Sequence, residues 1–196
     1  MSAQLLHEYF ERISHLLRSE TRRAGADYDL QPIQLDALSF LNRANRYSNT
    51  PQGVTEYLGL TKGTVSQTLM VLERKGLIQK KPDKKDGRIV HLNITKVGRK
   101  LLGKTLPTQT VQKVWEDISE SRQNQLIEEL QQLLKTMQQL NGMKPFGLCL
   151  SCRYNQKKSA GKFFCALTQE NLSQADTKLI CREYQLPEET GSINTC

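Results

Sequence analysis

Long apolar runs and histidines are scarce in this sequence, and each shortage excludes a class of protein. No apolar run approaches the roughly 18 residues of a membrane-spanning helix, and charged residues interrupt the leucines of residues 5–17, unlike a secretory signal. We therefore expect a cytoplasmic protein. The chain has 3 histidines, His7, His15 and His91. Because they offer no catalytic triad and no metal cluster, and no glycine loop suits a phosphate, we expect no enzyme.

Acidic side chains are scarce in one stretch of the chain. Residues 61–100 contain 11 of the 28 lysines and arginines but only 3 of the 20 aspartates and glutamates. This stretch alone therefore accounts for the net charge of +8 of the whole chain. A concentration of cations attracts polyphosphate by displacing its condensed counterions. The charge distribution therefore indicates double-stranded DNA as a partner, bound in a salt-dependent way.

Apolar spacing predicts a mainly α fold with one small β-hairpin, an α+β arrangement. Helices are expected over residues 3–24, which Gly25 ends, and over 32–44, 54–58, 62–75, 96 to a break at Pro107, and 117–140. Residues 48–53 are expected to form a loop. Alternating apolar residues predict two strands on either side of a turn at residues 82–87. Two helices joined by a tight turn and followed by a hairpin form a winged helix-turn-helix.

The second helix of that motif has the composition of a DNA-reading helix. Val65, Leu69 and Leu72 share one face and are expected to be buried, which leaves polar residues toward solvent. Gln67 can pair with an adenine edge and Lys62 with phosphate or guanine, while the hairpin tip suits the DNA backbone or minor groove. The predicted DNA-binding residues are Thr61, Lys62, Thr64, Ser66, Gln67, Thr68, Lys84, Lys85 and Arg88.

Several motifs in this order resemble the MarR family of bacterial regulators. They are the segments Leu60 to Gln67, Leu72 to Ile78, Asp83 to Arg88, Leu92 to Thr95, and Gly98-Arg99. The resemblance covers about residues 1–141. It implies a dimer with intertwined terminal helices and a wing arginine, here Arg88, in the minor groove. Gln67 departs from the family pattern, where an arginine is common, so the base preference of the family does not carry over.

The long helices predict a homodimer. Leu126, Leu130, Leu133, Met137 and Leu140 form a heptad seam in the last helix, and the first helix has an apolar face. Their alternative role is an intramolecular core. We therefore divide residues 1–141 into a DNA-binding core at 31–97 and dimerisation helices at 3–24 and 99–140. A two-fold dimer predicts an inverted-repeat operator with half-sites about one DNA turn apart.

Residues 142–196 form a small cysteine-rich appendage after a linker at 143–147. Cys149, Cys152, Cys165 and Cys181 have the spacing of metal ligands. One C-x2-C pair with two isolated cysteines slightly favours an iron–sulfur cluster over Zn²⁺. A reversible disulfide, a structural zinc site and unrelated buried cysteines are alternatives. Cys196, at the end of the sequence, is left out of the site.

These observations give three hypotheses about function. The first is a DNA-binding regulator, more often a repressor in the family, whose operator affinity depends on the cofactor or redox state of the cysteines. The second is a family-style regulator that responds to a small aromatic effector, with a purely structural zinc site. The third is a thiol oxidoreductase using Cys149 and Cys152, which is disfavoured because this pair does not lie in a thioredoxin-like βαβ unit. A winged helix that binds only proteins is a further alternative, which the placement of the charge disfavours.

Overall fold

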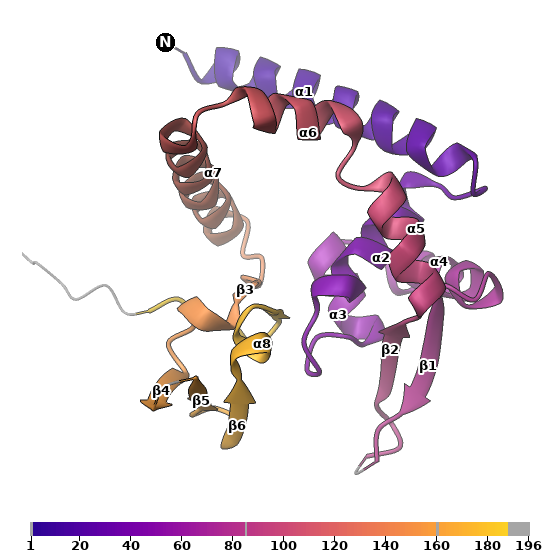
Figure 1. The fold of residues 1–196 in the computed structure, drawn as a ribbon, viewed down its shortest axis with the longest axis vertical. Helices are drawn as coiled ribbons and strands as arrows, with labels where there is room; N and C mark the ends of the chain where they lie inside the picture. Colours follow the sequence, from indigo (N-terminus) through magenta and orange to yellow (C-terminus); the bar gives the residue numbers. More distant parts are fainter. Residues whose placement is uncertain (1, 85, 160, 188–196) are drawn as a thin grey trace, which may run out of the picture.

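The structure is a computed structural model that describes residues 2–84, 86–159 and 161–187. Its first part is a winged helix with long flanking helices (Figure 1). The elements up to the wing are α1 (Ala3–Ala26), α2 (Pro32–Arg43), α3 (Pro51–Leu58), α4 (Lys62–Arg74), β1 (Ile78–Pro82) and β2 (Val90–Ile94). Three helices follow, α5 (Lys96–Thr105), α6 (Gln109–Asp117) and α7 (Glu120–Leu140). The expected mainly helical fold with a hairpin wing is confirmed.

Threonine caps start three of the helices. Thr50 Oγ1 accepts a hydrogen bond from the backbone N–H of Gly53 at 3.0 Å, and Thr61 and Thr95 cap α4 and α5 in the same way. Such a side chain satisfies one of the N–H groups that the first helical turn leaves without an intrahelical acceptor. Because Thr50 caps and Pro51 suits the first turn, α3 begins at Pro51 rather than at residue 54. The expected loop over residues 48–53 is therefore too long.

Gly25 lies inside α1, so the prediction that it ends the helix is wrong. The helix continues to Ala26. A Cβ atom at Gly25 would lie 2.4 Å from the carbonyl oxygen of Leu30, closer than real Cβ contacts come. The glycine is needed because the chain turns back tightly against the end of α1.

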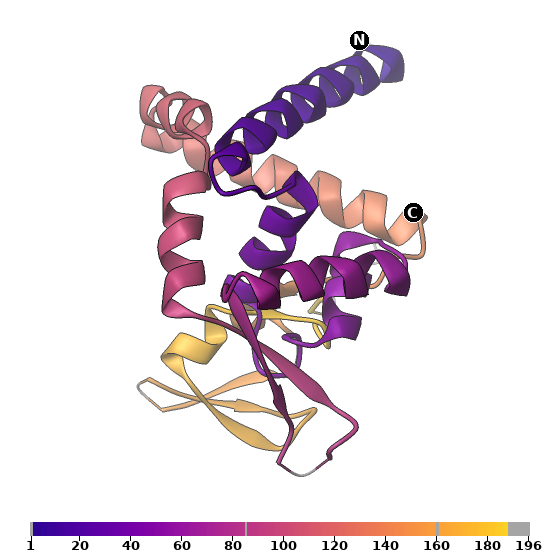
Figure 2. The ribbon, with the colours of Figure 1, turned by 90° about the vertical axis from the view of Figure 1, so that its right-hand side faces the viewer.

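The core of the winged helix lies between α2, α3, α4, α5 and the hairpin. Its fully buried members include Phe40, Leu35, Leu38, Leu72 and Ile78. In the antiparallel hairpin Ile78 pairs with Ile94 and Pro82 with Val90. Leu92 and Ile94 of β2 are buried, as their alternation predicts. From the side, the hairpin projects toward the end of the molecule opposite α1 and α6 (Figure 2).

The helices after the wing differ from the expected pattern in their boundaries. The expected break at Pro107 is confirmed, since α5 ends at Thr105 and α6 begins at Gln109. The last long helix begins at Glu120 rather than at residue 117. Searched over the described residues, no helix is long and apolar enough to cross a membrane.

Residues 147–181 form small sheets that the sequence analysis does not predict. Strands β4 (Asn155–Ser159), β5 (Lys162–Cys165) and β6 (Glu170–Ser173) make an antiparallel sheet in that order. The two-residue strands β3 (Gly147–Leu148) and β7 (Ile180–Cys181) pair beside it. A 3-10 turn at Cys149–Ser151 and the short helix α8 (Gln174–Thr177) complete the unit. We call residues 146–187 the cysteine module.

The cysteine module packs against the winged helix. Ile180 is 6% exposed and belongs to the same apolar cluster as Leu38 and Leu72. Its carbonyl oxygen accepts a hydrogen bond from the Asn45 N–H at 2.9 Å. The Phe146 ring meets Phe40 edge-on, with ring centroids 5.9 Å apart. The module therefore shares a core with the helix-turn-helix.

Candidate nucleic-acid interface

The reading helix α4 has one buried and one exposed face. Val65, Leu69 and Leu72 are buried, as predicted. The side chains that the sequence analysis placed toward solvent, apart from Thr68, are exposed. They are Lys62, Thr64, Ser66 and Gln67. This face of α4 can therefore meet a partner without unfolding the core.

Thr68 is the exception, and the expectation that its side chain lies toward solvent is wrong. Its side chain is buried, with 4% exposed. It follows Val65 by three residues and precedes Leu72 by four, and such residues share one face of a helix. The position of Thr68 on the helix therefore outweighs the polarity of its side chain.

Thr61 and Thr64 contact each other at the start of α4. Thr61 Oγ1 accepts the Thr64 N–H at 3.2 Å, and the two hydroxyl oxygens are 2.9 Å apart. Both residues are exposed. They therefore fix where α4 begins.

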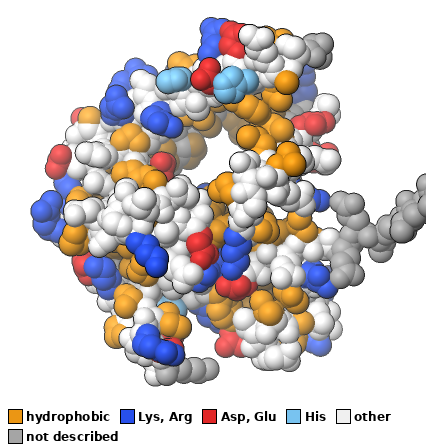
Figure 3. Space-filling view, turned by 180° about the vertical axis from the view of Figure 1, so that it is seen from behind, with side chains coloured by type: hydrophobic (Ala, Val, Ile, Leu, Met, Phe, Trp, Pro, Cys, Tyr) orange, Lys and Arg blue, Asp and Glu red, His pale blue; other side chains and the backbone are white. Residues whose placement is uncertain are grey.

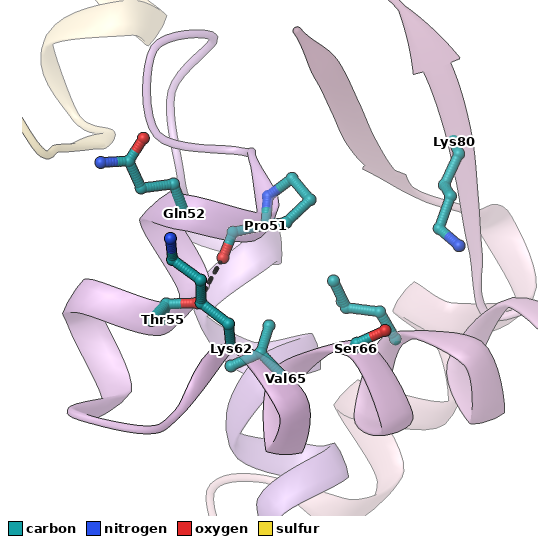
Figure 4. A pocket seen from close by; sticks show the side chains of 8 residues that line it. Pro51, Gln52, Thr55, Lys62, Val65, Ser66 and Lys80 are labelled. Carbon is teal, nitrogen blue, oxygen red and sulfur yellow. Dashed lines mark hydrogen bonds between the residues drawn. The ribbon is translucent and has the colours of Figure 1, made fainter. Parts of the chain in front are cut away.

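A hollow of about 460 Å³ lies between α3, α4 and β1 (Figure 4). Lys80 reaches into it from β1, and the Lys62 side chain lies on its α3 side. Lys80 Nζ also donates a hydrogen bond to Glu73 Oε2 at 2.6 Å. The residues that line the hollow are Pro51, Gln52, Thr55, Lys62, Val65, Ser66, Leu69 and Lys80. Gln52, Thr55 and Lys80 are not among the predicted residues, although Lys80 lies within the basic stretch.

The tip of the wing presents cations to solvent. Arg88 is paired with Asp86, with Nη2 and Oδ2 at 2.8 Å, and its side chain remains 91% exposed. The hydrogen bonds from Arg88 hold the pKa of the Asp86 carboxyl below its ordinary value. Lys84 is exposed, and Lys85 lies outside the described residues.

His91 fixes the wing to the loop before α3. Its Nδ1 lies 2.8 Å from Asn49 Oδ1, and its Nε2 lies 2.9 Å from Asp83 Oδ2. The Leu92 N–H donates to the Asn49 carbonyl oxygen at 2.6 Å. These bonds hold the hairpin at a set position relative to α3. The sequence carries no local signal for them, because Asn49 and His91 are far apart along the chain.

Apolar side chains are exposed on the helices outside the winged helix. Figure 3 shows hydrophobic side chains at the end of the molecule where α1, α6 and α7 lie. The exposed residues are Leu5, Leu6, Tyr9, Ile13, Leu16 and Leu17 of α1, Val111, Val114 and Trp115 of α6, and Leu126, Ile127, Leu130, Leu134, Met137 and Leu140 of α7. Of the predicted heptad seam, Leu133 alone is half-buried in the chain itself.

Residues 28–89, which contain α2, α3, α4 and β1, match the sequence profile of the MarR family. The winged-helix part of this chain is therefore similar to the MarR family. The transcriptional repressor MprA of Escherichia coli K12 is 26% identical over 106 residues, which are 53% of this chain and 60% of MprA. The match thus spans less than two thirds of that relative.

Solved structures of MarR-like regulators cover more of the chain. FabT of Streptococcus pneumoniae in complex with DNA is 28% identical, with a TM-score of 0.56 over 71% of this chain and 99% of FabT. The MepR–DNA complex of Staphylococcus aureus is 25% identical, with a TM-score of 0.55 over 69% of this chain and 98% of MepR.

The cysteine module contains four thiols beside the winged helix. Cys149, Cys152, Cys165 and Cys181 are free thiols, and the first and last are buried. Burial, together with the nearby thiols of Cys181, Cys152 and Cys165, raises the pKa of the Cys149 thiol to about 11. Asn155 Nδ2 donates to Cys149 Sγ at 3.6 Å. Cys149 lies in the 3-10 turn at Cys149–Ser151 and Cys152 directly follows that turn. Cys165 and Cys181 are the last residues of β5 and β7.

A metal ion was the predicted ligand of these thiols. Among the described residues, no group of three or more His, Cys, Asp or Glu side chains has an arrangement that could hold a metal ion. Four thiolate donors suit a thiophilic metal. In the described arrangement, however, the sulfur atoms do not form a site for one. Cys196 lies outside the described residues.

Proposed function

We propose that this MarR-like chain is a sequence-specific, double-stranded DNA-binding transcriptional regulator. One observation carries the proposal. The exposed polar face of α4 and the cationic wing tip both belong to the region that holds the net positive charge of the chain, and the hollow beside α4 is lined by Lys62, Ser66 and Lys80 of that region. A solvated surface with no partner would not need its cations and its hydrogen-bonding residues on the same elements.

The geometry suits contacts by α4 in the major groove of DNA and by the wing in the minor groove. An α-helix fits the major groove, so the first half of α4 can bring Lys62, Ser66 and Gln67 to base edges or phosphates. Lys80 and Gln52, at the rim of the hollow, would meet the phosphates that flank the groove. Arg88 would enter the narrower minor groove from the wing. The reading helix thus supplies sequence preference, and the wing supplies position and charge.

We propose further that the chain acts as a homodimer, and as a repressor. Exposed apolar side chains along α1, α6 and α7 support the dimer, because apolar patches of this extent are uncommon on monomers. MprA is a repressor, and MepR and FabT have been crystallised with DNA. A two-fold dimer that occupies an inverted repeat would compete with transcription at the same site.

The cysteine module is the proposed sensing part. Its four thiols would undergo reversible oxidation or, once brought closer together than in the described arrangement, would bind an iron–sulfur cluster or a zinc ion. Either change would alter operator affinity. What supports this is the donor set of thiols and the shared core with the helix-turn-helix. Visible absorbance near 400 nm and metal analysis on anaerobically purified protein separate the three cases. Unchanged operator affinity of C149S and C152S in both aerobic and reducing buffer would overturn the sensing role.

Selection of genomic DNA tests the core of the proposal. Purified protein should enrich a small set of fragments, and footprinting should protect an inverted repeat with half-sites about one helical turn apart. A matched protein carrying Lys62→Ala and Gln67→Ala should lose this enrichment while keeping its unfolding midpoint. Equal recovery of all fragments by the wild-type protein would contradict a sequence-specific regulator.

A further inference from the structure

Cys181 lies between two residues that are built into the winged helix. On one side Ile180 is buried in the common core. On the other, the backbone N–H of Arg182 donates to Ser48 Oγ at 2.8 Å, and Ser48 is fully buried in the loop before α3. A displacement of Cys181 must therefore move at least one of these two anchors.

The Arg182 side chain extends from this anchor to α3. Its Nη2 donates to Glu56 Oε1 at 2.8 Å, and the two side chains are 16% and 26% exposed. Arg182 Nε also lies 3.4 Å from Glu183 Oε1. Within the described residues, Glu56 Oε2 is buried without a hydrogen-bond partner. The Glu56 carboxylate therefore depends on Arg182 for its cationic contact.

Glu56 also holds a residue of the candidate DNA surface. Gln52 Nε2 donates to the same oxygen, Glu56 Oε1, at 2.7 Å, one turn earlier on α3. Gln52 lines the hollow between α3, α4 and the wing, next to Lys62 (Figure 4). A continuous chain of contacts therefore joins the residue after Cys181 to the surface that would meet phosphate.

The charge of Glu56 decides what this chain of contacts does. An unpaired carboxylate beside the hollow would repel an approaching phosphate, and the effect is strong where water is partly excluded. Arg182 cancels that charge and keeps Oε1 in place to accept from Gln52. Removal of one partner of a partly buried ion pair leaves the other uncompensated.

We propose that Arg182 is a positioning residue for DNA binding that couples the cysteine module to the reading surface through Glu56 and Gln52. The inference rests on the proposed DNA-binding function, which it extends by naming the route of control. A change at Cys181 that withdraws Arg182 exposes the Glu56 charge toward the DNA and releases Gln52. Operator affinity then falls without any change in α4 or the wing.

A double-mutant cycle with operator DNA tests this route. Operator affinity is measured for the wild type, R182Q, E56Q and R182Q/E56Q at one salt concentration. R182Q should weaken binding about tenfold, as expected when a partly buried charge loses its partner. E56Q removes the repelling charge, so E56Q and the double variant should bind within about threefold of the wild type. R153Q is the matched control, because it removes the same charge from the module at a residue that lies over the Tyr154 ring.

Additive losses in the cycle would overturn the coupling, as would an R182Q protein that binds like the wild type. Urea unfolding of all variants separates stability from affinity, since a merely structural Arg182 would not be rescued by E56Q. If R182Q does not fold, the comparison of R182K with R182K/E56Q carries the same test. A wild-type protein that selects no operator defeats the proposed function itself, whereas a binding wild type with additive losses defeats only the coupling.

The same set of variants also tests whether Cys181 acts through Arg182. C181S should weaken operator binding in the wild-type background but have no effect in R182Q/E56Q, because the Glu56 charge is already absent there. An equal loss in both backgrounds would show that Cys181 acts by another route and would overturn its coupling through Arg182.

Discussion

The Arg88 guanidinium is bound by the Asp86 carboxylate through two hydrogen bonds, from Nε to Oδ1 at 2.9 Å and from Nη2 to Oδ2 at 2.8 Å. The Arg88 N–H donates to Asp86 Oδ1 as well, at 3.0 Å. The exposed cation at the wing tip therefore already has an anionic partner. In the proposed complex, a DNA phosphate or the acceptor edge of the minor groove would replace Asp86, so the pair would set how readily the wing engages.

Substitution of Arg88 should weaken DNA binding by charge. We expect R88A to reduce operator affinity about tenfold and to lower the slope of log affinity against log salt by about 1, the share of one phosphate contact. Asp86→Asn should act in the opposite direction, because it frees the guanidinium. Fluorescence anisotropy over a salt series measures both. An unchanged slope for R88A would show that the wing does not contact DNA.

Gln67 should influence which base is preferred at one position. We expect Q67A to lose about 1–3 kcal/mol of discrimination there, and to retain most of its affinity for unrelated DNA. Binding to operators with each base at that position measures the effect. Gln132→Ala, at an exposed position of α7, is the matched control. A uniform loss across all four bases would assign Gln67 to the backbone instead.

The apolar face of α7 should carry the dimer. Leu130 is 46% exposed on that face, and a charge there would be desolvated in an interface. We expect L130D to shift the protein from dimer to monomer in sedimentation experiments and to weaken operator binding. Gln131→Asp, the neighbouring exposed residue, should leave the dimer intact. A dimeric L130D protein would place the interface elsewhere.

Ile180 should stabilise the winged helix although it belongs to the cysteine module. Because it is buried in the common core, we expect I180A to lower the free energy of unfolding by about 2–4 kcal/mol. Leu167→Ala, at a side chain that is 45% exposed, should change it by less than about 1 kcal/mol. Urea unfolding should show one cooperative transition. A separate transition for the module would mean that it folds independently of α2 and α4.

Local signals in the sequence predict many of the helix boundaries in the winged-helix part of the chain. Thr61 and Thr95 predict the starts of α4 and α5, and Pro107 predicts a break after α5. These signals are local, because a cap or a missing N–H acts within one helical turn. The start of α3 escaped prediction because Thr50 and Pro51 lie in a stretch that resembles a loop. Thr68 is polar, but its position between Val65 and Leu72 places it on the buried face of α4.

Contacts between distant segments could not be predicted. Ile180 meets Asn45, and Arg182 meets Glu56, across more than a hundred residues, and no periodicity encodes such pairs. Gln52 and Lys80 reach the candidate site only because α3 and β1 flank α4 in the folded chain. The four thiols, by contrast, were identified from their spacing, while their arrangement depends on the folding of short strands.

The dependence of operator binding on salt tests the central claim most directly. Affinity is measured between 50 and 200 mM salt for the selected operator and for a scrambled fragment of equal length. A surface that neutralises several phosphates predicts a steep linear fall of log affinity with log salt. The operator should stay at least about a thousandfold tighter than the scrambled fragment throughout. Equal affinity for both fragments, or a flat salt dependence, would contradict a DNA-reading function for α4 and the wing.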